Sequence, residues 1–142
     1  MRALLDVNVI IALLDAGHAH HALATKWLGQ NIKQGWASCP ITQNGTIRIL
    51  SQPAYPNHVT TTEVAARLRE AIGTIYHEFW PDGVSMLDDE LFNWSVLLNA
   101  RQLTDAYLLA LAVKNKGRFV TFDRGISLTA VPRATSKHLV LI

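Results

Sequence analysis

Three aspartates stand where strands and helices could bring them together. Asp6 interrupts the apolar run Leu4–Ile11, Asp123 follows the apolar stretch Phe119–Phe122, and Asp105 lies near the start of an alanine- and leucine-rich segment. Carboxylates that share one buried site repel one another, and burial raises their pKa values. A divalent cation relieves that conflict. All-oxygen ligands of this kind suit Mg²⁺ or Mn²⁺ rather than zinc.

The chemistry that such a cluster predicts is hydrolysis of a nucleic acid. Divalent cations held by carboxylates activate water and neutralise the charge of a phosphodiester. Acids at strand ends also occur as helix caps, because a carboxylate accepts hydrogen bonds from the first N–H groups of a helix. On its own stretch of sequence, Asp6 is therefore open to both interpretations, metal ligand and helix cap.

The elements that must position these acids alternate along the chain. Strands are expected over residues 4–7, 35–41, 84–87, 118–122 and 138–142. Helices are expected over residues 10–14, 22–29, 43–50, 64–76, 91–98 and 103–114. This alternation predicts an α/β fold, a parallel sheet with helices on both faces. Right-handed crossovers in such a sheet would bring Asp6, Asp105 and Asp123 to the same rim.

Helix-start signals place two polar side chains near that rim. Thr42 is a good N-cap for the helix expected after the second strand, and this puts Gln43 in its first turn. Thr104 is the expected N-cap of the helix over 103–114, with Gly117 placed to end it. Asp105 then lies in the first turn, where the helix dipole favours its ionised form.

Composition narrows the class of protein. The 142 residues are most simply one domain, and a formal charge of +2 is too small to indicate nucleic-acid binding by itself. Cys39 is the only cysteine, so an internal disulfide is impossible. No uninterrupted apolar stretch approaches the length of a transmembrane helix. We expect a soluble, cytoplasmic protein without membrane association.

Two other polar clusters have competing interpretations. His18, His20 and His21 are dense enough to raise the question of zinc, but their spacing fits a polar loop before a helix equally well. The acids Asp88–Glu90 could bind a metal, and they could also cap the helix expected over residues 91–98. We favour the capping interpretation.

Four segments together resemble a known family. They are Leu4-Leu5-Asp6-Val7-Asn8-Val9, Cys39-Pro40-Ile41-Thr42-Gln43-Asn44-Gly45, Leu103-Thr104-Asp105-Ala106-Tyr107-Leu108 and Val120-Thr121-Phe122-Asp123-Arg124-Gly125. In this order the chain resembles PIN-domain proteins and, more narrowly, the VapC toxins of bacterial toxin–antitoxin pairs. The likeness covers essentially all of residues 1–142.

The resemblance implies a three-layer α/β/α sandwich with a mainly parallel central sheet. It also implies a Mg²⁺- or Mn²⁺-dependent endoribonuclease, a homodimer, whose cognate VapB-like antitoxin places its tail in the active site. By position, Asp6 and Asp105 become the principal metal ligands. Asp123 becomes a further catalytic acid that orients a second ion or the attacking water, and Asn8 lies close enough to help orient Asp6.

One departure from the family leaves a second function open. Gln43 stands where most of the family carries a glutamate, and it brings no negative charge. The alternative is a PIN-like module that binds RNA or protein with weak or no nuclease activity. A haloacid-dehalogenase-like phosphatase is disfavoured, because it needs a second acid at the position of Asn8.

The RNA substrate would have to be held by cations that the sequence does not rank. The candidates for phosphate contacts are Arg48, Arg67, Arg69, Lys114, Lys116, Arg118 and Arg124. Sequence-specific RNA recognition mostly targets single-stranded loops.

Overall fold

Five short strands form a single sheet in the computed structural model, which describes residues 1–142. The strands are β1 (Ala3–Leu5), β2 (Trp36–Ser38), β3 (His77–Phe79), β4 (Arg118–Thr121) and β5 (Leu139–Leu141). They lie in the order β3-β2-β1-β4-β5, and every neighbouring pair is parallel. The central pair is β1 and β4, with Leu5 opposite Val120. The residues that follow these two strands therefore leave the sheet side by side.

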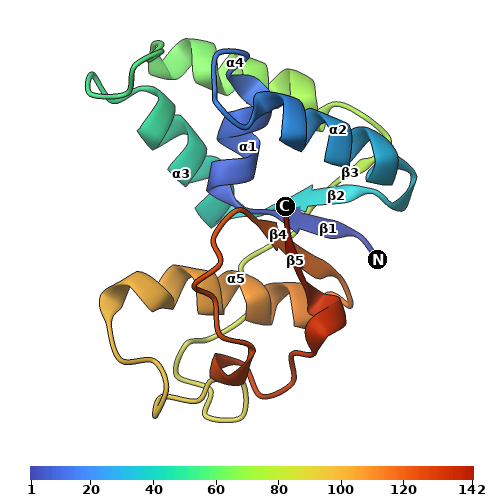
Figure 1. Ribbon diagram of the computed structural model, residues 1–142, viewed down its shortest axis with the longest axis vertical. Coiled ribbons are helices and arrows are strands. Elements are labelled where there is room, and N and C mark those ends of the chain that lie inside the picture. Colours follow the sequence, from blue (N-terminus) through green and yellow to red (C-terminus); the bar gives the residue numbers. More distant parts are fainter.

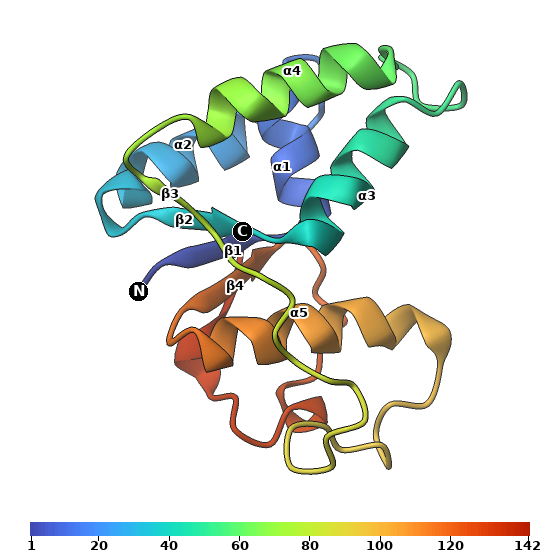
Figure 2. The same cartoon turned by 180° about the vertical axis from the view of Figure 1, so that it is seen from behind.

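Helices cover both faces of the sheet, which confirms the three-layer α/β/α architecture (Figures 1 and 2). One face carries α1 (Val7–Leu14), α2 (His21–Asn31), α3 (Pro40–Leu50) and α4 (Thr61–Ile72). The other face carries α5 (Leu103–Lys114). Short 3₁₀ helices span Ile32–Gln34, Ala100–Gln102, Leu128–Ala130 and Ser136–His138.

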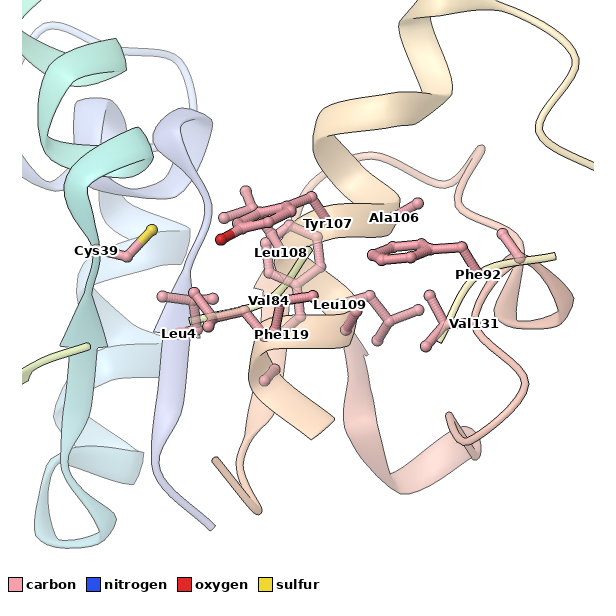
Figure 3. Close-up of a cluster of buried hydrophobic side chains, with 14 of the residues drawn as sticks. Leu4, Cys39, Val84, Phe92, Ala106, Tyr107, Leu108, Leu109, Phe119 and Val131 are labelled. Atoms are coloured by element: carbon pink, nitrogen blue, oxygen red, sulfur yellow. The ribbon is translucent and has the colours of Figure 1, made fainter. Parts of the chain in front are cut away.

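Alternate side chains of the strands pack into two cores, one on each face. The core on the α5 side contains the strand residues Leu4, Ala37 and Phe119. They pack with Tyr107 and Leu108 of α5 (Figure 3). Their neighbours in the strands face α1 to α4, and these are Ala3, Leu5, Trp36 and Val120. Because both faces of the sheet are covered, the central strand β1 is wholly apolar and buried, whereas the edge strand β3 carries the half-buried His77 and the exposed Glu78. Asp6 follows at the end of β1.

Helix α5 is buried along nearly its whole length, as its composition predicts. Residues 106–112 are all buried, so this helix is apolar on every side. Its first turn reaches the carboxyl-end rim of the sheet and carries Asp105. The predicted place of Asp105 is thus correct, while the predicted cap is wrong. The helix begins at Leu103 behind the 3₁₀ turn Ala100–Gln102, so Thr104 lies inside it.

Other helix ends also differ from the sequence prediction. Helix α3 begins at Pro40 with Cys39 as N-cap, because proline at the first position is preorganised for a helix. Thr42 is the third helical residue and not the cap, and its hydroxyl accepts a hydrogen bond from the Cys39 N–H (2.9 Å). At the end of α5 the residue with positive φ is Lys116 (54°), one before Gly117.

The segment between α4 and α5 was predicted least well. Helix α4 starts at the Thr60–Glu63 capping box, but it ends at Ile72, and Ile75 is 89% exposed rather than packed in the core. The third strand lies at residues 77–79, whereas residues 84–87 and 91–98 form neither the expected strand nor the expected helix. A three-residue edge strand leaves too short a pattern to recognise.

The first helix starts three residues earlier than expected, at Val7, directly behind Asp6. None of the helices combines the length and the apolar character that a membrane span requires.

Candidate active site

Asp6 links the end of β1 to the start of α1. It is the N-cap of α1, and its Oδ1 accepts a hydrogen bond from the Val7 N–H (2.7 Å). Its Oδ2 accepts a second one from the Thr121 hydroxyl (2.6 Å), and only 7% of the residue is exposed. Burial raises the pKa of Asp6, the hydrogen bonds from Thr121 and Val7 oppose that rise, and the charge of Asp123 adds to it. Asp6 is therefore a helix cap whose carboxylate also lies among other acids.

The hydroxyl of Thr121 organises the end of β4. Besides donating to Asp6, it accepts hydrogen bonds from the Asn8 side-chain amide (3.3 Å) and from the Asp123 N–H (3.0 Å). Asn8 therefore acts on Asp6 through Thr121. The sequence prediction did not include Thr121. Its only signal was a hydroxyl two residues before an acid at a strand end.

The third acid completes what we call the acidic rim, the carboxylates of Asp6, Asp105 and Asp123. Burial raises the pKa of Asp105 to about 7, together with the charges of Asp6 and Asp123 and a hydrogen bond with Asp123. Asp105 and Asp123 line the same pocket, and Asp6 and the backbone of Asp123 both bond to the Thr121 hydroxyl, so the structure brings together the three acids that the sequence singled out. Asp123 is the most exposed of them, and its Oδ1 accepts the Gly125 N–H (2.7 Å).

The donor set of the rim fits a hard divalent cation. It offers only carboxylate oxygens, and burial first and the neighbouring charges second disfavour the ionised form of Asp105. A positive charge between them would remove that conflict. No group of three or more acidic, histidine or cysteine side chains is arranged so that it could hold a metal ion by itself.

Two separate pockets include acids of the rim. The α3 pocket, of about 460 Å³, is lined by Asp6, Val7, Asn44, Arg48, Asp82 and Thr104, among others. The loop pocket, of about 270 Å³, is lined by Asn99, Arg101, Gln102, Asp105, Asp123 and Ser127, among others. Asp82 and Arg101 were not predicted as site residues. Asp82 lies in an irregular segment and Arg101 in a single 3₁₀ turn, and neither segment has a periodic pattern that marks the direction of a side chain.

Gln43 turns away from the acidic rim. Its side-chain amide donates a hydrogen bond to the Ser38 hydroxyl (3.0 Å), which is itself bonded to the His77 ring (2.8 Å). Gln43 lines neither pocket, whereas its neighbour Asn44 lines the α3 pocket beside Asp6. The polar side chain of α3 that faces the rim is thus one residue later than expected.

The histidine and acid clusters have local structural roles. The His18 ring accepts the His20 N–H (3.0 Å), the His20 ring stacks on Phe122, and the His21 ring is bonded to the Ala12 carbonyl. Asp88 accepts the Glu90 N–H (3.0 Å) in a turn. These contacts match the loop interpretation of the histidines, while the helix that the acids were expected to cap is absent.

Comparisons with known proteins agree with this geometry. The PIN domain family model matches residues 3–132. The chain is 54% identical to Ribonuclease VapC44 of Mycobacterium tuberculosis over the full length of both. It is 41% identical to Ribonuclease VapC39 of the same organism, covering 92% of this chain and 94% of that one.

Two solved structures share the fold. One is VapC20 of Mycobacterium tuberculosis, a toxin that cleaves the sarcin–ricin loop, with a TM-score of 0.63, 15% identity, and coverage of 93% of this chain and 98% of that one. The other is VapBC2 of Rickettsia felis bound to a DNA fragment from its promoter. It has a TM-score of 0.61, 13% identity, and coverage of 100% of this chain and 98% of that one. At these identities the likeness concerns the fold alone.

Proposed function

The chain belongs to the VapC-type ribonucleases of the PIN-domain family, and from this premise we propose that it is a Mg²⁺- or Mn²⁺-dependent endoribonuclease. The observation that carries the proposal is the convergence of Asp6, Asp105 and Asp123 from β1, α5 and β4. Asp105 and Asp123 line one pocket, and Thr121 links Asp6 to the backbone of Asp123. The reaction is hydrolysis of an RNA phosphodiester bond by water.

Each of the three acids of the rim has its own role in the proposed reaction. Asp6 is held by the Val7 N–H and the Thr121 hydroxyl, so its position is fixed before substrate arrives. Asp105 must lose its proton to serve as a ligand, and a pKa of about 7 makes that step easy near neutral pH. Asp123 is exposed and orients the attacking water. A cation bound by these acids would supply the water activation and the neutralisation of phosphate charge.

The test is metal-dependent cleavage of RNA by Asp6→Asn and Asp105→Asn variants. Removing a side chain that hydrogen-bonds to a metal ligand commonly lowers activity about 10–100-fold. Removing a ligand itself should therefore lower the cleavage rate at least about 100-fold. Asp89→Asn is the matched control, because Asp89 is an exposed acid that lines neither pocket. Equal cleavage by wild type and both rim variants would assign the activity to a contaminant and remove the proposal.

The same assay, with a gel-shift measurement beside it, tests the binding-only alternative. A module that binds without cutting would retain RNA in a gel-shift assay and show no metal-dependent products. Gln43 was the reason for that alternative, and its side chain lies against Ser38 rather than at the rim.

We further propose that residues 1–142 act as one domain and as the toxin of a toxin–antitoxin pair, as a homodimer neutralised by a VapB-like protein. The structural neighbour from Rickettsia felis, VapBC2, supports a partner of that kind. Expression of this chain should arrest bacterial growth, and co-expression of a small open reading frame directly upstream should relieve the arrest. Light scattering of the purified chain tests the dimer.

A further inference from the structure

An arginine stands in each of the two pockets that include acids of the rim. Arg48 lines the α3 pocket next to Asp6, and Arg101 lines the loop pocket next to Asp105 and Asp123. Both arginines are exposed, and neither side chain forms a hydrogen bond or an ion pair. Two uncommitted guanidinium groups thus line two separate pockets, each of which includes at least one acid of the rim.

The other arginines either form ion pairs or line neither of the two pockets. Arg2 pairs with Glu78, and Arg133 pairs with Glu90. Arg118 donates to Asn31 and lies over the ring of Trp27. The exposed Arg67 and Arg69 of α4 and Arg124 line none of the pockets described. The structure therefore ranks cations that the sequence left equal, and it adds Arg101 to them.

The two pockets differ in what they offer to a base. The α3 pocket has apolar walls from Val7, Ile41 and Ile49, with the amide of Asn44 beside them. It adjoins a mainly apolar hollow with which it shares Ile41, Asp82 and Thr104, and in which Trp94 is 42% exposed. The loop pocket is richer in polar groups, among them Asn99, Gln102 and Ser127.

These features match the needs of an unpaired RNA strand. Single-stranded RNA is bound through cations on its phosphates, aromatic rings under its unstacked bases and hydrogen bonds to base edges. The α3 side offers a cation, an exposed indole and an amide, and the loop side offers a cation and several amides. The acids between them repel phosphate, so the flanking cations must supply the attraction.

We propose that a single RNA strand crosses the acidic rim from one pocket into the other. Arg48 and Arg101 contact phosphates on opposite sides of the bond that is cut, and a base on the Arg48 side stacks on Trp94. The inference rests on the proposed function, because it takes the acidic rim as the place of cleavage.

Phosphate contacts are tested by the salt dependence of RNA binding. The probe is a fluorescent single-stranded RNA dodecamer, measured by anisotropy without divalent cations so that it stays intact. Arg48→Ala and Arg101→Ala should each weaken binding about 10-fold and lower the slope of log affinity against log salt by about 0.7. Arg67→Ala should change neither quantity. Arg48→Lys and Arg101→Lys should restore the slope.

The two-sided path is tested with shortened substrates. Oligonucleotides are trimmed from the 5′ side or from the 3′ side of the cleaved bond, and KM and kcat are measured separately. On full-length RNA, both Arg48→Ala and Arg101→Ala should raise KM. Once the nucleotides on one side of the cleaved bond are removed, Arg48→Ala should no longer raise KM. Arg101→Ala should lose its effect on KM only when the nucleotides on the other side are removed. Trp94→Ala should follow Arg48→Ala. Loss of both arginine effects on trimming the same side would overturn the path.

Failure of this inference can be told from failure of the proposed function. If Asp6→Asn cuts RNA as well as wild type, the acidic rim is not the place of cleavage, and the anisotropy titration still tests the RNA contacts. Undiminished RNA binding and an unchanged salt slope in both arginine variants would overturn the inference. If such variants also escaped inhibition by a co-expressed antitoxin, the arginines would contact a protein partner instead of RNA, and the inference would still be overturned.

Discussion

At the scale of single residues, the hydroxyl of Thr121 has the most partners at the site. It donates to Asp6 and accepts from Asn8 and from the backbone of Asp123. Two of the three rim acids therefore depend on one oxygen atom that never needs to touch RNA. This makes Thr121 a positioning residue.

Replacing that hydroxyl should loosen the rim without removing an acid. Thr121→Val keeps the branched shape and leaves buried groups without partners, so we expect a loss of about 1–3 kcal/mol in the free energy of unfolding. Cleavage should fall about 10–100-fold. Thr121→Ser keeps the oxygen and should recover most of the activity. A valine variant with wild-type kcat would show that the hydroxyl does not position the acids.

Asp105 should make the stability of the metal-free protein depend on pH. Its pKa is about 7 in the folded chain, while an unfolded aspartate has a pKa of about 4. A carboxyl whose pKa rises on folding stabilises the folded state at low pH, and that contribution is lost as pH rises through the folded pKa. The free energy of unfolding should therefore decline between about pH 4 and about pH 7 on this account.

The comparison that isolates this contribution is Asp105→Asn against wild type, by urea unfolding in EDTA across that range. The variant should decline less steeply, and some slope should remain because the pKa of Asp6 is also raised. Asp89→Asn should behave as wild type. Parallel curves for wild type and Asp105→Asn would mean that Asp105 does not titrate in this range.

Asn44 and Gln43 provide a matched pair at neighbouring positions of α3. Asn44→Asp adds a carboxylate to the pocket that contains Asp6, so it should tighten Mn²⁺ binding measured by calorimetry. Gln43→Glu places its carboxylate beside Ser38 and His77 and should leave Mn²⁺ affinity within about two-fold of wild type, since no oxygen is added at the rim. The reverse order would place Gln43 at the rim.

At the scale of elements, the position of the α3 pocket depends on how closely α1 and α3 approach. A Cβ on Gly45 would lie 2.8 Å from the Cγ2 of Val7, the first residue of α1 after Asp6. The absence of a side chain at Gly45 therefore lets α3 pack directly against the helix that Asp6 caps.

Gly45→Ala should destabilise the protein despite the helix propensity of alanine. Overpacking costs about 1–3 kcal/mol, which outweighs a propensity gain of at most about 1 kcal/mol. Gly29→Ala in α2 meets nothing within 4 Å and should raise stability by about 0.5–1 kcal/mol. Urea unfolding of both variants measures the difference. Equal stabilisation of the two would show that α1 and α3 have room to separate.

Element boundaries also show where sequence reasoning reached its limit. The apolar runs of β1 and α5 were sufficient to locate Asp6 and Asp105, because burial leaves a strong pattern. Caps were misjudged at Thr42 and Thr104, where a proline and a 3₁₀ turn start the helices earlier. The start of a helix sets which face each side chain occupies. The error at Thr42 therefore led us to expect Gln43 at the rim, where the structure has Asn44.

At the scale of the whole molecule, the acidic rim lies where two cores meet. The core on the α5 side supplies Asp105, and the junction of β1 with α1 supplies Asp6. Alternation of strands and helices predicted this meeting correctly, since parallel strands must end at the same edge. Arg48 was one of several candidates that the sequence could not rank, and the two pockets and the place of Arg101 beside the rim could not be predicted. They depend on irregular segments and on side-chain directions that only the folded chain defines.

The two ends of the chain differ in how close they come to the rim. Ile142 donates its N–H to the Thr121 carbonyl (3.1 Å), while Met1 contacts Gln34 before the amino end of β1. A purification tag or surface tether at the carboxyl terminus would therefore be attached next to a residue that is hydrogen-bonded to Thr121, and Thr121 holds Asp6. The same attachment at the amino terminus would leave from the opposite edge of the sheet. A tag attached at Met1 should therefore disturb the acidic rim less than a tag at the carboxyl terminus.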